Sequence, residues 1–266
     1  MKTTATIATV VTLCTLVTAG CAGGRPPALP YPAFIPTDEL PDVFLAALPG
    51  VRAKQLAGDM HTRTASNRVD IPPDWTGSTG GSPGKALELF VMSGELRVGD
   101  IALGAGGYLY VPPGSLGFRL ASDHGARILY FLNDVPATSV IRAPLLLDSN
   151  LVEWQETSPG IFTKVLREDP GSGARTWLYR VTPVGVVPWQ SSTVGREGYL
   201  LRGQYRHSEC LDGLAATGEY GPGGYFRRPP GAINGGPESR AETESVWFLR
   251  ESSAGERNEA VTCGDG

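Results

Sequence analysis

The chain has 266 residues with a formal net charge of −4, of which 41% are apolar and 19% are charged. Its 35 glycines and 22 prolines are the poorest helix formers, so the composition disfavours an all-helical fold and favours many short strands joined by turns. The apolar fraction and the low net charge disfavour wholesale disorder. A pI of about 5.5 leaves no basic surface, so we expect no nucleic-acid partner.

The N-terminus is predicted to be a targeting segment. Residues 1–20 contain one early charge, an apolar and threonine-rich stretch and then small residues, which is typical of a secretory signal peptide. The segment LVTAGC that ends at Cys21 resembles a bacterial lipobox, although Thr18 replaces the usual aliphatic residue. This resemblance implies lipidation of Cys21 and an extracytoplasmic protein anchored to a bacterial membrane. The alternative is ordinary cleavage near the same place and secretion.

Residues 21–49 are predicted to be a proline-rich spacer followed by one short helix. The stretch from 25 to 41 contains six prolines, which is typical of a semi-rigid tether. The helix is expected over 37–48, with Thr37 or Asp38 as its N-cap and a Pro-Gly pair as its end.

Two of the four cysteines remain for the folded part. Cys14 leaves with the signal peptide and Cys21 takes the lipid, which leaves Cys210 and Cys263. An oxidising compartment permits a disulfide between them, and two free thiols are the alternative.

An internal repeat organises the rest of the chain. Residues 104–114 (GAGGYLYVPPG) recur as 221–231 (GPGGYFRRPPG), with seven identities at an offset of 117. The preceding strand, 88–94, recurs as 197–203 at an offset of 109, so the second copy holds eight extra residues, which we place in a hairpin around His207. The repeat predicts two similar β domains, at 50–136 and 150–252, and a tail at 253–266.

The repeated turns resemble the second conserved motif of the cupin superfamily. Segment 164–176 resembles the entry strands of cupins related to zinc-dependent anti-sigma factors and to acetylacetone and acetophenone dioxygenases. The resemblance implies an all-β bicupin, which is two tandem jelly-roll barrels in one chain.

The metal ligands of that superfamily are missing from this sequence. Cupins usually bind the metal through His-x-His and Glu in the first motif and His in the second. The matching positions in the second half are Gln190-Ser191-Ser192, Arg196 and Asn234, and in the first half Gly81-Ser82-Pro83, Leu87 and Gly117. Glu88 and Glu197 lie one residue too late, which turns a strand side chain to the other face unless a bulge intervenes.

The second barrel is the better candidate for a ligand site. Arg196 stands where a metal ligand would point inward, and its guanidinium suits a carboxylate or phosphate. The alternative is a rim arginine that is solvated or paired with Glu197 or Glu209. The expected ligand-binding residues are Trp189, Gln190, Ser192, Arg196, Tyr225 and Asn234. His61 shares a strand face with Asp59 and is expected to face solvent or to be hydrogen-bonded, with an acid–base pair or half a metal site as the alternative. His124, in a turn, and His207, in the hairpin, are expected at the surface.

The sequence therefore predicts a metal-free, non-catalytic lipoprotein that binds a small anionic or sugar-like ligand. No cofactor is expected. The alternative is a cupin-type enzyme (dioxygenase, isomerase or lyase) with a divalent metal such as Fe, Zn or Mn at an atypical site, and a third reading is a structural protein without a pocket. Catalytic residues are not assigned. The expected partners are the small-molecule ligand, the membrane through the lipid, and a second copy in a homodimer.

Overall fold

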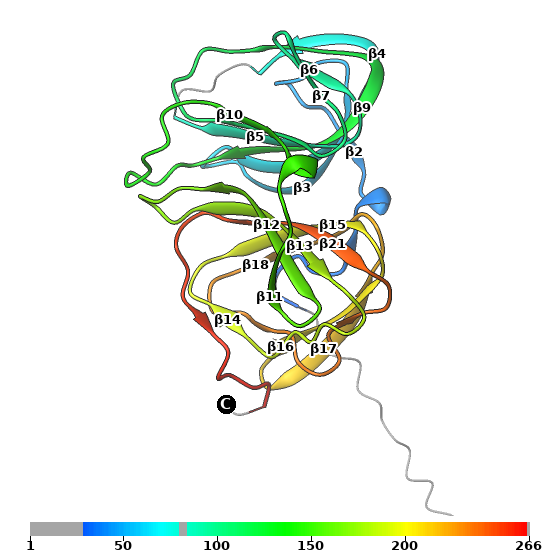
Figure 1. Ribbon diagram of the computed structural model, residues 1–266, viewed down its shortest axis with the longest axis vertical. Helices are drawn as coiled ribbons and strands as arrows, with labels where there is room; N and C mark the ends of the chain where they lie inside the picture. Colours follow the sequence, from blue (N-terminus) through cyan, green and yellow to red (C-terminus); the bar gives the residue numbers. More distant parts are fainter. Residues whose placement is uncertain (1–28, 80–83, 265–266) are drawn as a thin grey trace, which may run out of the picture.

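Two β barrels lie one above the other along the longest axis of the molecule (Figure 1). The computed structural model describes residues 29–79 and 84–264. The predicted signal peptide, the predicted lipidation site Cys21 and the segment Gly81-Ser82-Pro83 lie outside the described residues. None of the described helices is long and apolar enough to span a bilayer.

The N-terminal barrel is built from one strongly bent sheet with the order β10-β8-β5-β9-β4-β3-β2, to which β6 and β7 add. Its strands are β2 (Asp42–Val43), β3 (Arg52–Asp59), β4 (Thr64–Ser78), β5 (Ala86–Gly94), β6 (Leu96–Val98), β7 (Ile101–Leu103), β8 (Gly107–Val111), β9 (Arg119–Asn133) and β10 (Leu145–Asp148). The two 15-residue strands β4 and β9 pair along nearly their whole length.

The C-terminal barrel is built from two main sheets and a small strand pair. The larger sheet contains β1 (Ile35–Pro36), β18 (Gly224–Arg228), β15 (Arg196–Arg202), β21 (Ser245–Glu251), β13 (Arg175–Val181), β12 (Ile161–Glu168) and β11 (Gln155–Ser158), in this order. The second sheet contains β17 (Leu214–Tyr220), β16 (Tyr205–Leu211), β19 (Ile233–Asn234) and β20 (Arg240–Ala241). The pair is β14 (Ser191–Ser192) with β22 (Arg257–Asn258).

Each barrel takes an edge strand from the segment that directly precedes the other barrel in the sequence. β1 lies in the predicted spacer before the N-terminal barrel, yet it pairs with β18 of the C-terminal barrel. β10 lies between the two predicted domains, and it pairs with β8 of the N-terminal barrel. Both short strands therefore belong to a barrel, although the predicted domain ranges exclude them.

The helix expected over 37–48 is a single 3-10 turn, Thr37–Glu39, and a second such turn covers Ser149–Leu151. Leu40 is already extended, with ψ of 147°, because the residue before a proline avoids the helical region. The chain then enters β2 instead of continuing a helix.

The repeat appears as equivalent turns of the two barrels. Gly94 has a φ of +75°, and a Cβ there would lie 2.2 Å from the carbonyl oxygen of Gly125. Gly203 has a φ of +95°, and a Cβ there would lie 2.4 Å from the carbonyl oxygen of Glu244. Both positions require glycine for the same reason, which is a left-handed backbone against a neighbouring strand.

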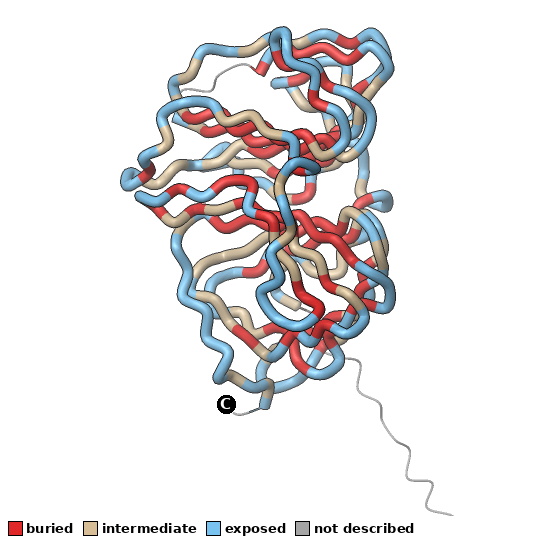
Figure 2. The backbone as a smooth tube through the Cα atoms, in the orientation of Figure 1, coloured by how far each residue is buried: buried red, intermediate tan, exposed pale blue. Residues whose placement is uncertain are grey.

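Three groups of buried residues hold the fold together (Figure 2). One fills the N-terminal barrel, one fills the C-terminal barrel, and the third lies between the two large sheets. The third includes Phe131 and Phe248, whose rings stack at 5.6 Å between centroids. Alternate residues of β5, β9, β15 and β21 thus point either into their own barrel or into this interface.

Candidate functional site

Three inward-facing positions differ in polarity between the two barrels. The repeat offsets match three residues of the N-terminal barrel with three of the C-terminal barrel: Leu87 with Arg196, Val98 with His207, and Val111 with Arg228. The match holds in three dimensions, because Leu87 pairs with Val111 across β5 and β8 as Arg196 pairs with Arg228 across β15 and β18. In the N-terminal barrel all three belong to the apolar core. The polar set in the C-terminal barrel is therefore not demanded by the fold.

Arg196 faces the C-terminal barrel, as the sequence predicts, but its ionic partner is Glu251. Arg196 donates from Nε to Glu251 Oε1 at 2.8 Å, and Arg175 donates from Nε to Oε2 at 2.8 Å. Burial raises the pKa of Glu251, but the two guanidiniums outweigh it and hold the pKa below its usual value. Neither Glu197 nor Glu209, the partners expected for a rim arginine, pairs with Arg196.

A second buried ion pair lies beside it. Arg228 donates from Nε and Nη2 to Glu209 Oε1, each at 2.7 Å, and Glu209 is completely buried. The hydroxyl of Tyr31, in the segment before β1, donates to Glu209 Oε2 at 3.0 Å. This arrangement neutralises Glu209 and ties the N-terminal segment to the barrel.

His207 is buried, which corrects the prediction of a surface residue. It lies on β16 inside the barrel, with 4% of its surface exposed, while His61 and His124 are exposed. Neither of its ring nitrogens has a hydrogen-bond partner, and Nε2 lies 3.8 Å from Glu209 Oε1. Burial is the main cause that lowers the imidazole pKa well below its usual value; Arg228 adds to this and the nearby Asn234 amide opposes it.

These groups surround a small cavity. It has about 40 Å³ of internal space and its polar walls are Gln190, Arg196, His207, Arg228, Asn234 and Arg257, beside aromatic walls such as Trp177 and Trp247. An adjoining space of about 10 Å³ is lined by Ser192 together with Gln190, Arg196 and Asn234. Four of the six predicted ligand residues are thus brought together: Gln190, Ser192, Arg196 and Asn234.

The other two predicted ligand residues, Trp189 and Tyr225, do not line this cavity. Tyr225 lies on the opposite face of β18, because its neighbour Phe226 faces inward, and its hydroxyl donates to Glu197 Oε2 at 2.8 Å. Trp189 packs against the backbone at Gly236 instead. A repeat count places residues on a strand, but it does not give the orientation of a loop residue such as Trp189.

The C-terminal tail covers one side of the cavity. β22 pairs with β14, and Arg257 on β22 contributes to the cavity wall. The predicted disulfide is present, since Cys210 on β16 is bonded to Cys263. The hairpin β16–β17, whose turn is at Asp212 and Gly213, confirms the expected insertion of the second copy.

Glu88 and Glu197 point away from the barrels and into the interface between them. Glu88 is completely buried and accepts hydrogen bonds from the Tyr108 and Thr176 hydroxyls and from Arg250. Arg250 also pairs with Glu197. The register shifts of β5 and β15 come after these glutamates, at residues 91–93 and 200–202, so no bulge turns them inward.

The residues at the superfamily's metal positions do not fit a transition metal. An arginine has no lone pair to offer, and amides and hydroxyls are poor substitutes for imidazoles. Within residues 29–79 and 84–264, no three His, Cys, Asp or Glu side chains gather in a way that could hold a metal ion.

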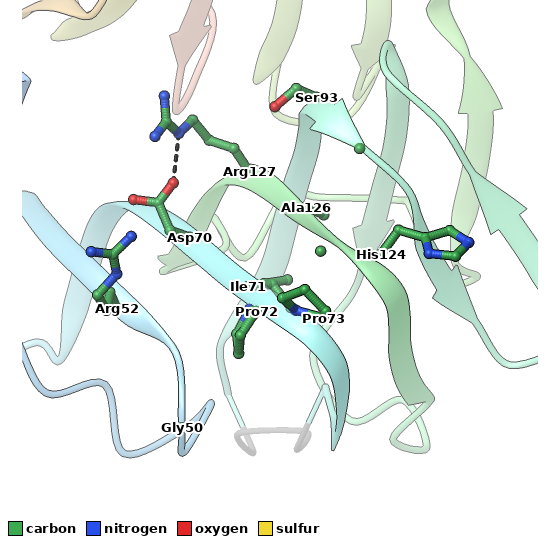
Figure 3. A pocket seen from close by; sticks show the side chains of 12 residues that line it. Gly50, Arg52, Asp70, Ile71, Pro72, Pro73, Ser93, His124, Ala126 and Arg127 are labelled. Carbon is green, nitrogen blue, oxygen red and sulfur yellow. Dashed lines mark hydrogen bonds and ion pairs between the residues drawn. The ribbon is translucent and has the colours of Figure 1, made fainter.

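A larger hollow lies elsewhere, on the outside of the N-terminal barrel (Figure 3). It is an open groove at Pro72 and Pro73, where an exposed Arg127 donates to Asp70 at 2.6 Å. Arg52 and His124 also border it, and both are exposed. The groove lacks convergent buried polar groups, so the cavity of the C-terminal barrel is the better candidate.

Comparisons with known proteins agree with this architecture. Residues 142–253 match the family model of the ChrR cupin-like domain. The crystal structure of the Escherichia coli protein Ylba superposes with a TM-score of 0.67 at 17% identity, over 82% of this chain and 89% of that one. A Bacillus subtilis oxalate decarboxylase variant superposes with a TM-score of 0.61 at 11% identity, over 88% of this chain and 81% of that one. None of the curated proteins matches the sequence. The fold is therefore that of the cupin superfamily, with two barrels in one chain.

Proposed function

We propose that this two-barrel cupin protein binds a small anionic ligand in its C-terminal barrel, without catalysis, as a lipoprotein anchored outside the cytoplasm. The observation that carries the proposal is the replacement of Leu87 and Val111 by Arg196 and Arg228 at equivalent inward positions. Since buried charges are costly and an apolar core serves the first barrel, the second barrel retains them for a purpose other than folding.

The size of the cavity limits the ligand. About 40 Å³ has room for roughly three water molecules, by the rule that one water needs about 10–15 Å³ of such space. This favours a carboxylic acid of a few atoms over a sugar. The guanidiniums of Arg196, Arg228 and Arg257 border the space. Two of them donate to buried carboxylates: Arg228 to Glu209 and Arg196 to Glu251. Among the residues that the structure describes, the one ionic partner of Arg257 is the exposed Glu259, at 3.6 Å.

Calorimetric titration with acetate, glycolate and glucose tests the proposal. We expect a small acid to bind and glucose not to bind. Arg196→Met should weaken acid binding at least tenfold. Arg175→Met is the matched control, because it breaks a bond to the same Glu251 but Arg175 does not border the cavity. Equal loss in both variants, or no acid binding, would contradict the proposal.

Metal analysis tests the alternative of a metal-dependent enzyme. Elemental analysis of the purified protein should find less than stoichiometric iron, zinc and manganese. A stoichiometric metal that is lost in a His207→Leu variant would reject the metal-free reading.

A further inference from the structure

The imidazole of His207 is a polar wall of the cavity, and both of its nitrogens are buried without a hydrogen bond of good geometry among the described residues. Burying a polar group without a partner is unfavourable, so the retention of His207 calls for an explanation. The equivalent inward residue of the N-terminal barrel is Val98, which shows that an apolar side chain is accommodated at this position.

Neither Glu209 nor Asn234 is free to donate a hydrogen bond to the His207 ring. Glu209 accepts from Arg228 and Tyr31, and its nearer oxygen stays 3.8 Å from Nε2. The Asn234 amide nitrogen donates to the backbone oxygens of Gln190 and Ala232, at 3.3 and 3.4 Å, whereas its oxygen lies near the ring and can accept from the imidazole N–H. The group that donates to the bare ring nitrogen must therefore come from inside the cavity.

The chemistry of a neutral imidazole defines what that group is. One ring nitrogen donates a hydrogen bond and the other accepts one. A carboxylate offers acceptors only, so it can satisfy the N–H but not the bare nitrogen. A hydroxyl group can donate to the bare nitrogen. Burial, and then the positive charges of Arg228 and Arg196, lower the imidazole pKa, so the ring stays neutral and does not become a double donor.

We propose that His207 recognises a hydroxyl group of the ligand, so that the site selects a small hydroxy acid over the acid without the hydroxyl. This inference rests on the proposed function, in which Arg196 and its neighbours hold the carboxylate. His207 then supplies the specificity for the uncharged end of the ligand.

The test compares two acids that differ by one hydroxyl group. Wild-type protein is titrated with glycolate and with acetate, and we expect glycolate to bind at least tenfold more tightly. In His207→Leu the ratio of the two affinities should fall to within about twofold of one. Equal binding of both acids by the wild type would overturn this inference but leave the proposed function standing. Binding of neither acid would overturn both.

A second measurement needs no variant. Nitrogen NMR of the imidazoles should show a ligand-dependent shift of His207 on addition of glycolate, while the exposed His61 and His124 serve as internal controls. If acetate shifts the His207 nitrogens as much as glycolate does, the cavity is completed by water and the proposed selectivity is wrong.

Discussion

Arg250 on β21 donates from Nε and Nη2 to Oε2 of Glu88 on β5, each at 2.8 Å, and so joins the two barrels through a completely buried carboxylate. The same guanidinium pairs with Glu197 on its other side. The barrels are thus joined by charge as well as by the aromatic residues around Phe131 and Phe248.

Removing the Arg250 guanidinium should strongly lower the free energy of unfolding. Arg250→Leu leaves two carboxylates without their main partner, and breaking a buried pair typically costs about 3–5 kcal/mol. Urea unfolding measures the loss. The matched control is Arg97→Leu, which breaks the exposed pair with Asp123 and should cost less than about 1 kcal/mol. Similar losses in both variants would show that the buried network contributes little.

Glu88 should make the protein sensitive to acid. Burial raises the pKa of this carboxyl, but Arg250 and Arg167 outweigh burial and lower the pKa from 4.5 to about 2. Because the folded state holds the lower pKa, this stabilisation is complete above pH 4.5 and is lost as the pH falls towards 2. Unfolding free energies measured across this range should depend less steeply on pH in Glu88→Gln than in the wild type. An unchanged slope would contradict the assignment.

His207 should make the stability of the fold depend on pH in a second range, above that of Glu88. Burial, followed by Arg228 and Arg196, lowers the pKa of its imidazole, whereas the unfolded chain takes up a proton near the ordinary histidine value of 6.5. As the pH falls below 6.5 this group therefore lowers the stability, by at most about 1.4 kcal/mol per pH unit. Denaturant unfolding at pH 7.5 and 5.5 should show a smaller difference for His207→Leu than for the wild type. The exposed His124, replaced in the same way, should leave the difference unchanged.

The disulfide should stabilise the fold and hold the tail. Cys210 and Cys263 are 53 residues apart, and a loop of this size corresponds to about 4 kcal/mol in the chain-entropy model. Cys263→Ser should lower the unfolding free energy by an amount of this order. Hydrogen exchange should also speed up at the Thr193 amide, which donates to Glu256 of the tail at 3.1 Å. A wild-type protein with two free thiols under non-reducing conditions would rule out the bridge.

Much of the architecture was readable from local sequence. The spaced glycines and prolines predict the turns, the offsets of 109 and 117 predict two equivalent barrels, and the same offsets align Leu87 with Arg196. The one-residue displacement of Glu88 and Glu197 predicts that both leave the barrel interior, since strand side chains alternate between faces. The same count could have placed His207 inside, opposite Val98, because both follow the repeated glycine by four residues.

Only the tertiary structure decided which partners these residues have. Arg196 pairs with Glu251, which is 55 residues away, and Glu88 pairs with Arg250, which is 162 residues away. Strand alternation states which face a side chain occupies, but the identity of its neighbours depends on how distant strands pair and how the two sheets pack. Tyr225, three residues from Arg228, lies on the other face of β18 by the same alternation, but only the packing of the two sheets brings its hydroxyl to Glu197 in the interface.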